Sequence, residues 1–230
     1  MQARRPVGIL GGMGPEATIL LQRKLLDVIP AQDDCDHIPL LIDMNPQVPS
    51  RIAHLIDGSG DNPGPTLAAM ARRLEIAGAK SLAMPCNTAH HYAPAIVDAV
   101  DIPLLNMIEI AATYAERALG PAGRVGMIAS PAMRQTRLFE IALEARGLSV
   151  LWPKDDAAML SAIRAIKKGR PDMSVRATVL SASSELLDAG ADMQFIACSE
   201  FSLVADSAAP DARVVDTLDL LVAEIVAFSA

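Results

Sequence analysis

The chain has 230 residues, of which 51% are hydrophobic and 20% are charged, and its net charge is −7. These values are typical of a folded globular protein with a large core, and they exclude an intrinsically disordered chain. The acidic balance and the lack of a Lys/Arg-rich run argue against a nucleic-acid partner or an anionic membrane surface, although a local cationic pocket is still allowed.

The alternation of apolar and amphipathic segments predicts an α/β fold with parallel strands. Short apolar runs predict buried strands at 7–10, 39–44, 81–85, 124–130, 148–153 and 193–199. Longer amphipathic stretches predict helices at 15–29, 65–77, 89–99, 107–119, 132–146, 156–168, 172–189 and 217–229. The turn-rich loop 57–65, "DGSGDNPGP", is expected at the surface.

The cysteine content and the N-terminal segment indicate the compartment. Three cysteines without CxxC spacing favour a reducing environment over a disulfide framework. Glycines interrupt the N-terminal apolar run too early for a signal peptide, and no run approaches the ~18 apolar residues of a membrane span. We therefore expect a cytoplasmic protein without a membrane partner.

An internal duplication predicts two similar lobes. The segment "PVGILGGMGPEAT" (6–18) aligns with "RVGMIASPAMRQT" (124–136), and "AGAKSLAMPCNTAH" (77–90) aligns with "AGADMQFIACSEFS" (189–202). The order is the same in both halves, and the cysteines coincide. We expect two pseudo-symmetric α/β lobes, each a parallel sheet flanked by helices, with the active site in the cleft between them. The predicted N-terminal lobe is 1–103 plus 213–230, and the predicted C-terminal lobe is 104–212.

The duplication singles out Cys86 and Cys198 as the pair that carries chemistry. Each follows an apolar strand, at the sheet edge where α/β proteins bind ligands, and precedes a polar helix start. A helix N-terminus lowers the pKa of a thiol and binds anions, so we expect reactive thiols. Two opposed thiols suit racemisation, because one can remove a proton from a carbon while the other delivers one to the opposite face. Cys35 is instead predicted to be a small buried hydrophobe.

Four motifs resemble those of a known enzyme family. The segments "GILGGMGPEAT", "NPQVPSR", "PCNTAH" and "ACSE" are similar to the aspartate/glutamate racemase family, most closely its aspartate racemase branch, and the match covers nearly the whole chain. The resemblance implies an isomerase that interconverts the L and D forms of aspartate or a related acidic amino acid. It also implies a homodimer, no cofactor and no metal, with Cys86 and Cys198 as the acid/base pair.

The same resemblance assigns roles to further residues by position. Asn87, Thr88 and Ser199 would hold the substrate carboxylate. Met13 and Gln47 would line the pocket, and Arg51 with a lysine of the "KKG" segment would meet a side-chain carboxylate. The residues that this implies for substrate binding are Met13, Gln47, Arg51, Asn87, Thr88, Ser130, Lys168 and Ser199, with Lys167, His90 and Glu200 in support.

The chain departs from the family pattern at four positions. Ser50 precedes the arginine where Asp is usual, and Met133 occupies a position where a hydroxyl is common. Ala197 replaces a Gly and Ser199 a Thr around the second cysteine. None of these changes removes the acid/base pair, but the missing hydroxyl leaves the substrate side chain open.

Several features allow alternative interpretations. The "GGMGPEAT" loop lacks the Lys-Ser/Thr of a P-loop and GxGxxG spacing, so we interpret its glycines as permitting a turn near a small carboxylate rather than binding a nucleotide. Cys86, His90 and Cys198 could ligate zinc, but no other ligand cluster supports this. His90 either orients a neighbouring polar group or is a satisfied core histidine. Glu200 either tunes Cys198 or caps its helix.

The charged residues and the overall function have alternatives of their own. Arg51 could be a solvated charge, and the lysine pair could be a helix C-terminal charge run. A maleate isomerase-like enzyme, an arylmalonate decarboxylase-like enzyme and a non-catalytic carboxylate-binding protein are the competing functions. Intact cysteines in both halves argue against the last of these.

Overall fold

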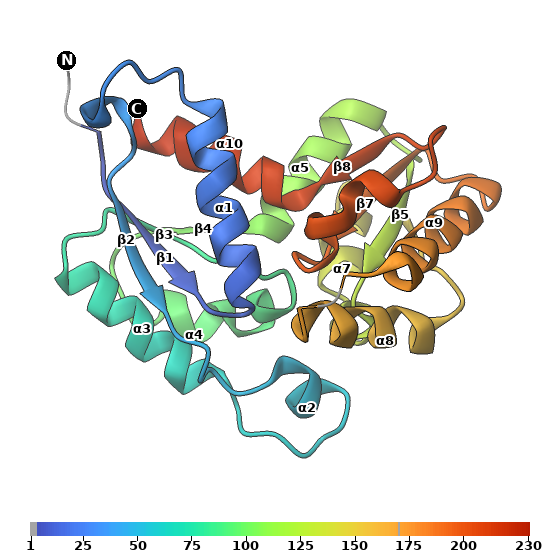
Figure 1. The fold of residues 1–230 in the computed structure, drawn as a ribbon, viewed down its shortest axis with the longest axis horizontal. Helices are drawn as coiled ribbons and strands as arrows, with labels where there is room; N and C mark the ends of the chain where they lie inside the picture. Colours follow the sequence, from blue (N-terminus) through green and yellow to red (C-terminus); the bar gives the residue numbers. More distant parts are fainter. Residues whose placement is uncertain (1–3, 170) are drawn as a thin grey trace. The chain divides into compact units, whose positions relative to one another are not determined.

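The computed structural model describes residues 4–169 and 171–230, which form two compact units. The N-terminal lobe comprises Met1–Met107 and Asp219–Ala230, and the C-terminal lobe comprises Ile108–Leu218 (Figure 1). The chain passes from one unit to the other near the start of α5 (Met107–Leu119) and again within α10 (Thr217–Ser229). The predicted boundaries, after residues 103 and 212, fall shortly before these helices, and residues 1–3 of the first predicted segment lie outside the described residues.

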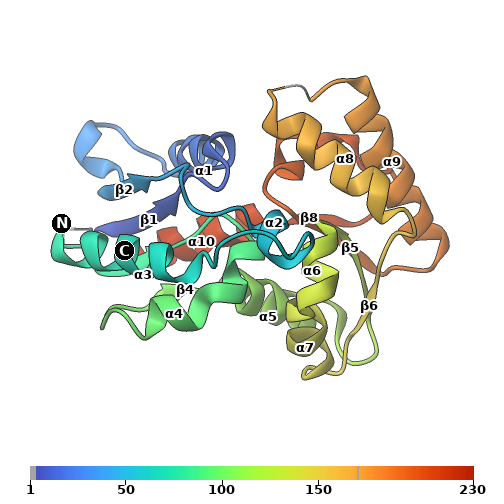
Figure 2. The same ribbon diagram turned by 90° about the horizontal axis from the view of Figure 1, so that it is seen from below.

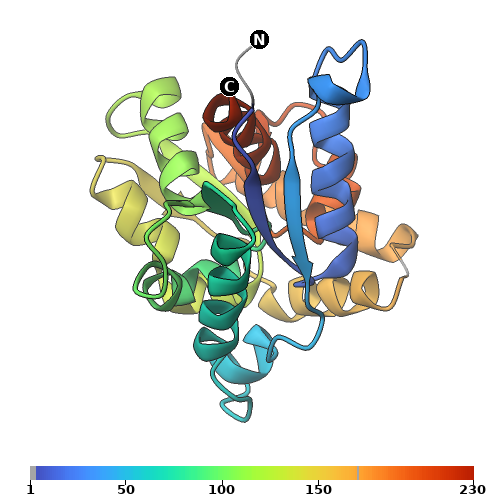
Figure 3. The ribbon, with the colours of Figure 1, turned by 90° about the vertical axis from the view of Figure 1, so that its left-hand side faces the viewer.

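The N-terminal lobe contains a four-stranded parallel sheet in the order β2-β1-β3-β4. Its strands are β1 (Val7–Gly11), β2 (Leu40–Met44), β3 (Ser81–Ala83) and β4 (Leu104–Leu105). Every residue of β1 and β3 is buried, as expected of inner strands that are covered on both faces. Figure 3 shows β1 and β2, in blue, side by side.

Helices cover both faces of this sheet. In Figure 2, α1 lies above it, whereas α3 and α4 lie below. These helices are α1 (Pro15–Val28), α3 (Gly64–Ile76) and α4 (Ala93–Val97); α4 continues the 3-10 helix η2 (Thr88–Tyr92). A further short helix, α2 (Arg51–Leu55), lies in the connection between β2 and α3. Between α1 and β2 the chain forms the 3-10 helix η1 (Asp34–Asp36).

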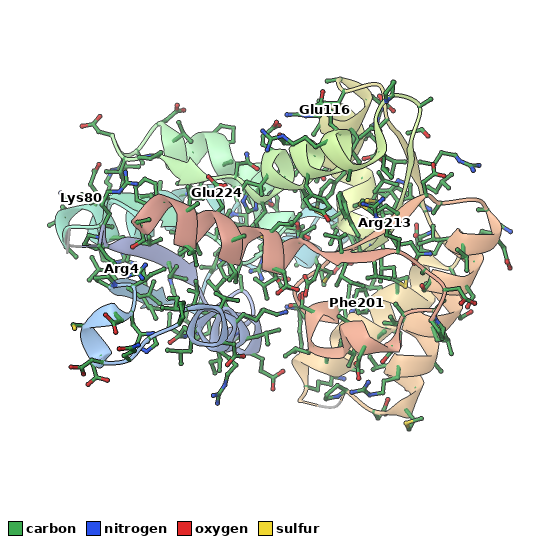
Figure 4. All side chains as sticks on the ribbon, turned by 90° about the horizontal axis from the view of Figure 1, so that it is seen from above. Arg4, Lys80, Glu116, Phe201, Arg213 and Glu224 are labelled. Atoms are coloured by element: carbon green, nitrogen blue, oxygen red, sulfur yellow. The ribbon has the colours of Figure 1, made fainter. Side chains whose placement is uncertain are left out.

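The C-terminal lobe repeats this topology with the sheet order β6-β5-β7-β8, again all parallel. Its strands are β5 (Arg124–Ala129), β6 (Ser149–Leu151), β7 (Met193–Ala197) and β8 (Val214–Asp216). Its helices are α5, α6 (Pro131–Thr136), α7 (Leu138–Glu144), α8 (Asp156–Lys167), α9 (Met173–Asp188) and the 3-10 helix η3 (Phe201–Ser207). Phe201, labelled in Figure 4, is fully buried together with Phe139 and Phe195.

The predicted α/β fold is confirmed, and all six predicted strands are present. Two further strands, β4 and β8, were not predicted; they are two and three residues long and form the last strand of each sheet. The single helix predicted over 132–146 is wrong. Arg137 adopts the left-handed conformation, with φ 56°, and separates α6 from α7. The predicted helix 89–99 begins as a 3-10 helix and becomes α-helical only from Ala93.

The prediction for Cys35 is also wrong, because this residue is exposed. It lies in η1, where Asp33 and Asp36 form a reciprocal capping box. The three aspartates next to Cys35 favour contact with water, and this preference outweighs the usual tendency of a free cysteine to be buried.

None of the helices in residues 4–169 and 171–230 is long and apolar enough to cross a membrane.

The glycine loop after β1 makes a close approach to the protein's own backbone. Gly12 has a φ of 92°, and a Cβ there would lie 2.4 Å from the carbonyl carbon of Asn45. The Thr18 hydroxyl accepts a hydrogen bond from the Gly12 N–H at 3.1 Å and donates one to the Gly14 carbonyl at 3.2 Å. The loop thus packs the end of β1 against the segment that follows β2.

We predict that Gly12→Ala destabilises the protein by about 3 kcal/mol, since it adds a left-handed strain and a backbone clash. Gly78→Ala is the matched control, because Gly78 has a φ of 105° but no atom within 4 Å of a Cβ. The control should lose only about 1 kcal/mol. Urea denaturation followed by circular dichroism measures both, and equal losses would show that the contact with Asn45 is unimportant.

Candidate functional site

Cys86 lies just beyond the end of β3 and is 6% exposed. Its N–H donates to the Met84 carbonyl at 2.8 Å, and η2 begins two residues later. The side chain belongs to a buried cluster that also contains Met13, Val48 and Tyr92. The third strand of the N-terminal lobe therefore places Cys86 at the carboxyl ends of the strands, as the sequence predicted.

The other N-terminal residues implied by the resemblance have different environments. Met13 is 2% exposed and packs in the same cluster as Cys86. Asn87 is buried, and Thr88 is partly buried at the start of η2. Gln47 is exposed, and its N–H donates to the Asn45 side-chain oxygen at 3.0 Å. The structure thus brings Met13 to Cys86 and leaves Gln47 at the surface.

Arg51 is the first residue of α2, which Ser50 caps by accepting from the Ala53 N–H at 3.2 Å. Nη1 of Arg51 donates to the carbonyl groups of Pro49 at 3.0 Å and Val48 at 3.4 Å. Its Nε is buried and has no hydrogen-bond partner among the described residues. The guanidinium group is therefore hydrogen-bonded to the backbone through Nη1, whereas its Nε–H is an unused donor.

Sequence reasoning missed Tyr92, which ends η2 and is 6% exposed. Its hydroxyl is buried and, like Nε of Arg51, has no hydrogen-bond partner among the described residues. Burial is the largest effect and raises the pKa of Tyr92; the charge of Arg51 opposes it, and a smaller electrostatic effect of Cys86 adds to the rise. The available signal was a tyrosine, one of only two in the chain, directly after the "PCNTAHH" motif.

His90 is buried with both ring nitrogens hydrogen-bonded to the backbone, as expected of a satisfied core histidine. Its ring is 3% exposed, and Nε2 accepts from the Met107 N–H at 3.1 Å. Nδ1 therefore carries the proton and donates to the Cys86 carbonyl at 2.9 Å. Burial lowers the pKa of His90 to about 4, against the weaker opposing effect of its backbone hydrogen bonds.

With both ring nitrogens bonded to the backbone, His90 has none left for a metal. Within the described part of the chain, no group of three or more His, Cys, Asp or Glu side chains could hold a metal ion. The zinc interpretation therefore has no support in this geometry.

Cys198 lies just beyond the end of β7 and is 6% exposed. Its thiol donates to Oε2 of Glu200 at 3.1 Å, and the other oxygen of that carboxylate pairs with the ammonium group of Lys167. Glu200 makes no capping hydrogen bond at the start of η3, so the capping interpretation is wrong. The carboxylate instead connects the thiol to the lysine.

The expectation of a lowered thiol pKa is wrong for Cys198. Burial is the largest effect and raises the pKa of Cys198 well above its usual value, and the charge and hydrogen bond of Glu200 raise it further. Lys167 lowers it by less. The low dielectric and the adjacent carboxylate thus outweigh any benefit from the helix start, and Cys198 rests as a thiol.

The remaining predicted residues of the C-terminal lobe differ in how far their side chains are buried. Ser130 is 3% exposed and caps α6 by accepting from the Ala132 N–H at 3.3 Å. Ser199 is buried directly after Cys198, and Met133 is completely buried. Lys168 is exposed at the end of α8. Lys167 is exposed as well, but its ammonium group pairs with Glu200, the hydrogen-bond partner of Cys198, and this contact distinguishes it from Lys168.

The comparisons with known proteins agree with this architecture. The sequence profile of the Asp/Glu/Hydantoin racemase family matches residues 10–225. The broad specificity amino-acid racemase RacX of Bacillus subtilis (strain 168) is 25% identical over 219 residues, which is 92% of each chain. The aspartate racemase of Picrophilus torridus superposes with a TM-score of 0.87 at 24% identity, covering 98% of this chain and 94% of that one. A glutamate racemase of Francisella tularensis superposes with a TM-score of 0.66 at 16% identity, covering 98% and 81%.

The family match makes the protein an isomerase of the racemase type, on a fold of two parallel sheets of the same strand order, each with a buried cysteine after its third strand. The chain belongs to the Asp/Glu/Hydantoin racemase family.

The buried His90 generates a prediction on pH and stability. Its pKa falls from about 6.5 in the unfolded chain to about 4 in the folded one, so the unfolded chain takes up the proton first as the pH falls. The contribution of His90 to stability is therefore complete above pH 6.5 and is lost between pH 6.5 and 4, by about 3 kcal/mol at most.

His90→Gln should flatten this pH dependence, because glutamine does not titrate. Urea denaturation from pH 7.5 to 4.5 measures the pH dependence of stability. His91→Gln is the control, since His91 is exposed and less buried than His90, although burial lowers its pKa too. If His90→Gln kept the wild-type slope, His90 would not be buried in the neutral form.

Proposed function

We propose that the protein is an amino-acid racemase that interconverts the L and D forms of aspartate or a related acidic amino acid without pyridoxal phosphate or a metal. The observation that carries the proposal is the equivalence of Cys86 and Cys198. Each is buried at the carboxyl end of the third strand of its own sheet, in lobes of the same strand order. The names of the relatives, which include aspartate and glutamate racemases and a broad-specificity amino-acid racemase, support this reaction class.

The proposed reaction moves one proton in and one proton out at the same carbon. A thiolate of one cysteine takes the Cα proton and becomes a thiol, leaving an electron pair on Cα. The thiol of the other cysteine then protonates the opposite face and becomes a thiolate. No oxidant or reductant is needed, and the two cysteines end with their protonation states exchanged.

Glu200 gives Cys198 a proton acceptor of its own in this scheme. Cys198 rests as a thiol, which is the form needed to donate a proton to Cα. When the reaction runs the other way, Cys198 must first lose its proton, and the Glu200 carboxylate is hydrogen-bonded to it at 3.1 Å. The ion pair with Lys167 holds that carboxylate in place.

Substrate binding follows the roles implied by the family. Asn87, Thr88 and Ser199 are proposed to hold the α-carboxylate, and Met13 and Gln47 to line the pocket. Arg51 is proposed to meet the side-chain carboxylate, because its Nε–H is an unused donor. Between the two lysines we assign Lys167, rather than Lys168, to the site, since only Lys167 reaches Glu200. We treat the lobes as pseudo-symmetric because each has the same strand order and carries a buried cysteine at the same place in its fold.

We further propose a cytoplasmic homodimer. All three cysteines are free, which suits a reducing compartment. Apolar side chains are exposed along α1, where Ile19 and Leu26 are 59% and 50% exposed, and on the edge strand β2 at Ile42 and Met44. A second copy of the chain covering this apolar surface would remove it from water.

The proposed activity is tested by incubating single enantiomers of a panel of amino acids in D2O and analysing them by chiral chromatography and mass spectrometry. We expect each single enantiomer to become a mixture of L and D forms without added cofactor, and a chelator should not change the rate. The product should carry deuterium at Cα because thiol protons exchange with solvent. Product that contains no deuterium would rule out the two-base reaction. Maleate-to-fumarate conversion, or binding without turnover, would support the competing functions.

Replacing either cysteine separates the two proposed roles. Cys86→Ser and Cys198→Ser should each abolish racemisation in both directions, because every turnover needs a base and an acid. A substrate with a leaving group at Cβ needs only the base, so each variant should still eliminate from one enantiomer, and the two variants from opposite ones. Cys35→Ser is the control and should behave like the wild type, as Cys35 is exposed in η1. Retention of elimination on the same enantiomer by both variants would contradict opposite-face action.

A further inference from the structure

Tyr92 has a buried hydroxyl that the fold itself does not use. The residue is 6% exposed, and its hydroxyl has no hydrogen-bond partner within residues 4–169 and 171–230. A buried hydroxyl without a partner destabilises a folded protein, and buried tyrosines usually bond theirs. A phenylalanine would fill the same space without this cost. The hydroxyl therefore points to a ligand.

A second unused donor lies near Tyr92. Nε of Arg51 is also buried and without a partner among the described residues, although Nη1 of the same guanidinium bonds two backbone carbonyls. Arg51 and Cys86 both act electrostatically on the Tyr92 phenol, which places each of them within electrostatic reach of Tyr92. Tyr92, Cys86 and Met13 belong to the same buried cluster.

The packing of α2 explains why these two donors lie together. The ring of His54, on the same helix as Arg51, contacts the Tyr92 ring in a tilted arrangement with centroids 5.8 Å apart, and its Nδ1 is hydrogen-bonded to the Gly60 carbonyl at 2.9 Å. His91 contacts the Tyr92 ring edge-on, at 5.0 Å between centroids. The ring is therefore contacted on two sides, and His54 joins it to α2, the helix that carries Arg51.

We propose that Tyr92 is a further substrate-binding residue, whose hydroxyl donates to the same side-chain carboxylate that Arg51 binds through Nε. This inference rests on the proposed function and names the substrate class, a dicarboxylic amino acid. Two donors, one of them cationic, suit an anion with two oxygens. Because burial raises the pKa of Tyr92, the phenol keeps its proton at neutral pH and acts as a donor.

Tyr92→Phe removes only the hydroxyl and tests the inference. The KM for aspartate or glutamate should rise about 10-fold to 100-fold, as for loss of a hydrogen bond to a charged group, with little change in kcat. Racemisation of alanine should be unchanged, since alanine has no side-chain carboxylate. Tyr114→Phe is the matched control, because Tyr114 is the only other tyrosine and is 37% exposed on α5.

Two further measurements separate substrate binding from a structural role. The melting temperature of Tyr92→Phe should equal or exceed that of the wild type, because the hydroxyl has no partner in the fold; a clear fall would overturn the inference. In a double-mutant cycle, Tyr92→Phe combined with Arg51→Ala should lose less than the product of the two single losses. Fully multiplicative losses would show that the two residues do not share a carboxylate.

Binding of succinate, measured by calorimetry, distinguishes failure of this inference from failure of the proposed function. If the wild type racemises acidic amino acids but Tyr92→Phe binds succinate and aspartate normally, the inference alone is wrong. If the wild type racemises nothing yet binds succinate at least 10-fold more tightly than Tyr92→Phe does, the dicarboxylate site stands and the racemase proposal fails. If the wild type binds no dicarboxylate, or Tyr92→Phe weakens alanine as much as aspartate, the inference is overturned.

Discussion

A parallel strand at the centre of a sheet is covered by helices on both faces, so the interior of each lobe is filled mainly by apolar side chains. Polar chemistry is confined to the edge where the strands end and the next helices begin. Both cysteines of the proposed acid/base pair occupy this position, Cys86 after β3 and Cys198 after β7. The glycine loop after β1 depends on the same constraint, because Gly12 must pass close to the Asn45 backbone to leave the sheet.

The two lobes share a topology but give their cysteines different surroundings. Cys198 is hydrogen-bonded to a carboxylate that pairs with Lys167, and burial with that carboxylate holds its pKa high. Cys86 packs instead among apolar side chains near Arg51 and Tyr92. A duplicated fold therefore does not give the two cysteines the same neighbours, since the side chains around each thiol differ between the lobes.

The departures from the family pattern have structural explanations in this chain. Ser50, in place of an aspartate, still caps α2 and so keeps Arg51 at the start of that helix. Met133 is completely buried in the first turns after β5, where it belongs to the core.

The sequence by itself determined the alternation of strands and helices, the duplication and the placement of both cysteines, because buried strands and amphipathic helices leave periodic patterns of apolar residues. It did not reveal α2 or the break at Arg137, since five residues carry no period and a left-handed residue that is not glycine has no local signal. Only the tertiary structure decided that Glu200 joins Cys198 to Lys167, because this contact spans 33 residues of chain. The unpaired hydroxyl of Tyr92 likewise exists only once α2 has packed against η2, as burial and the absence of a partner are properties of the folded surroundings.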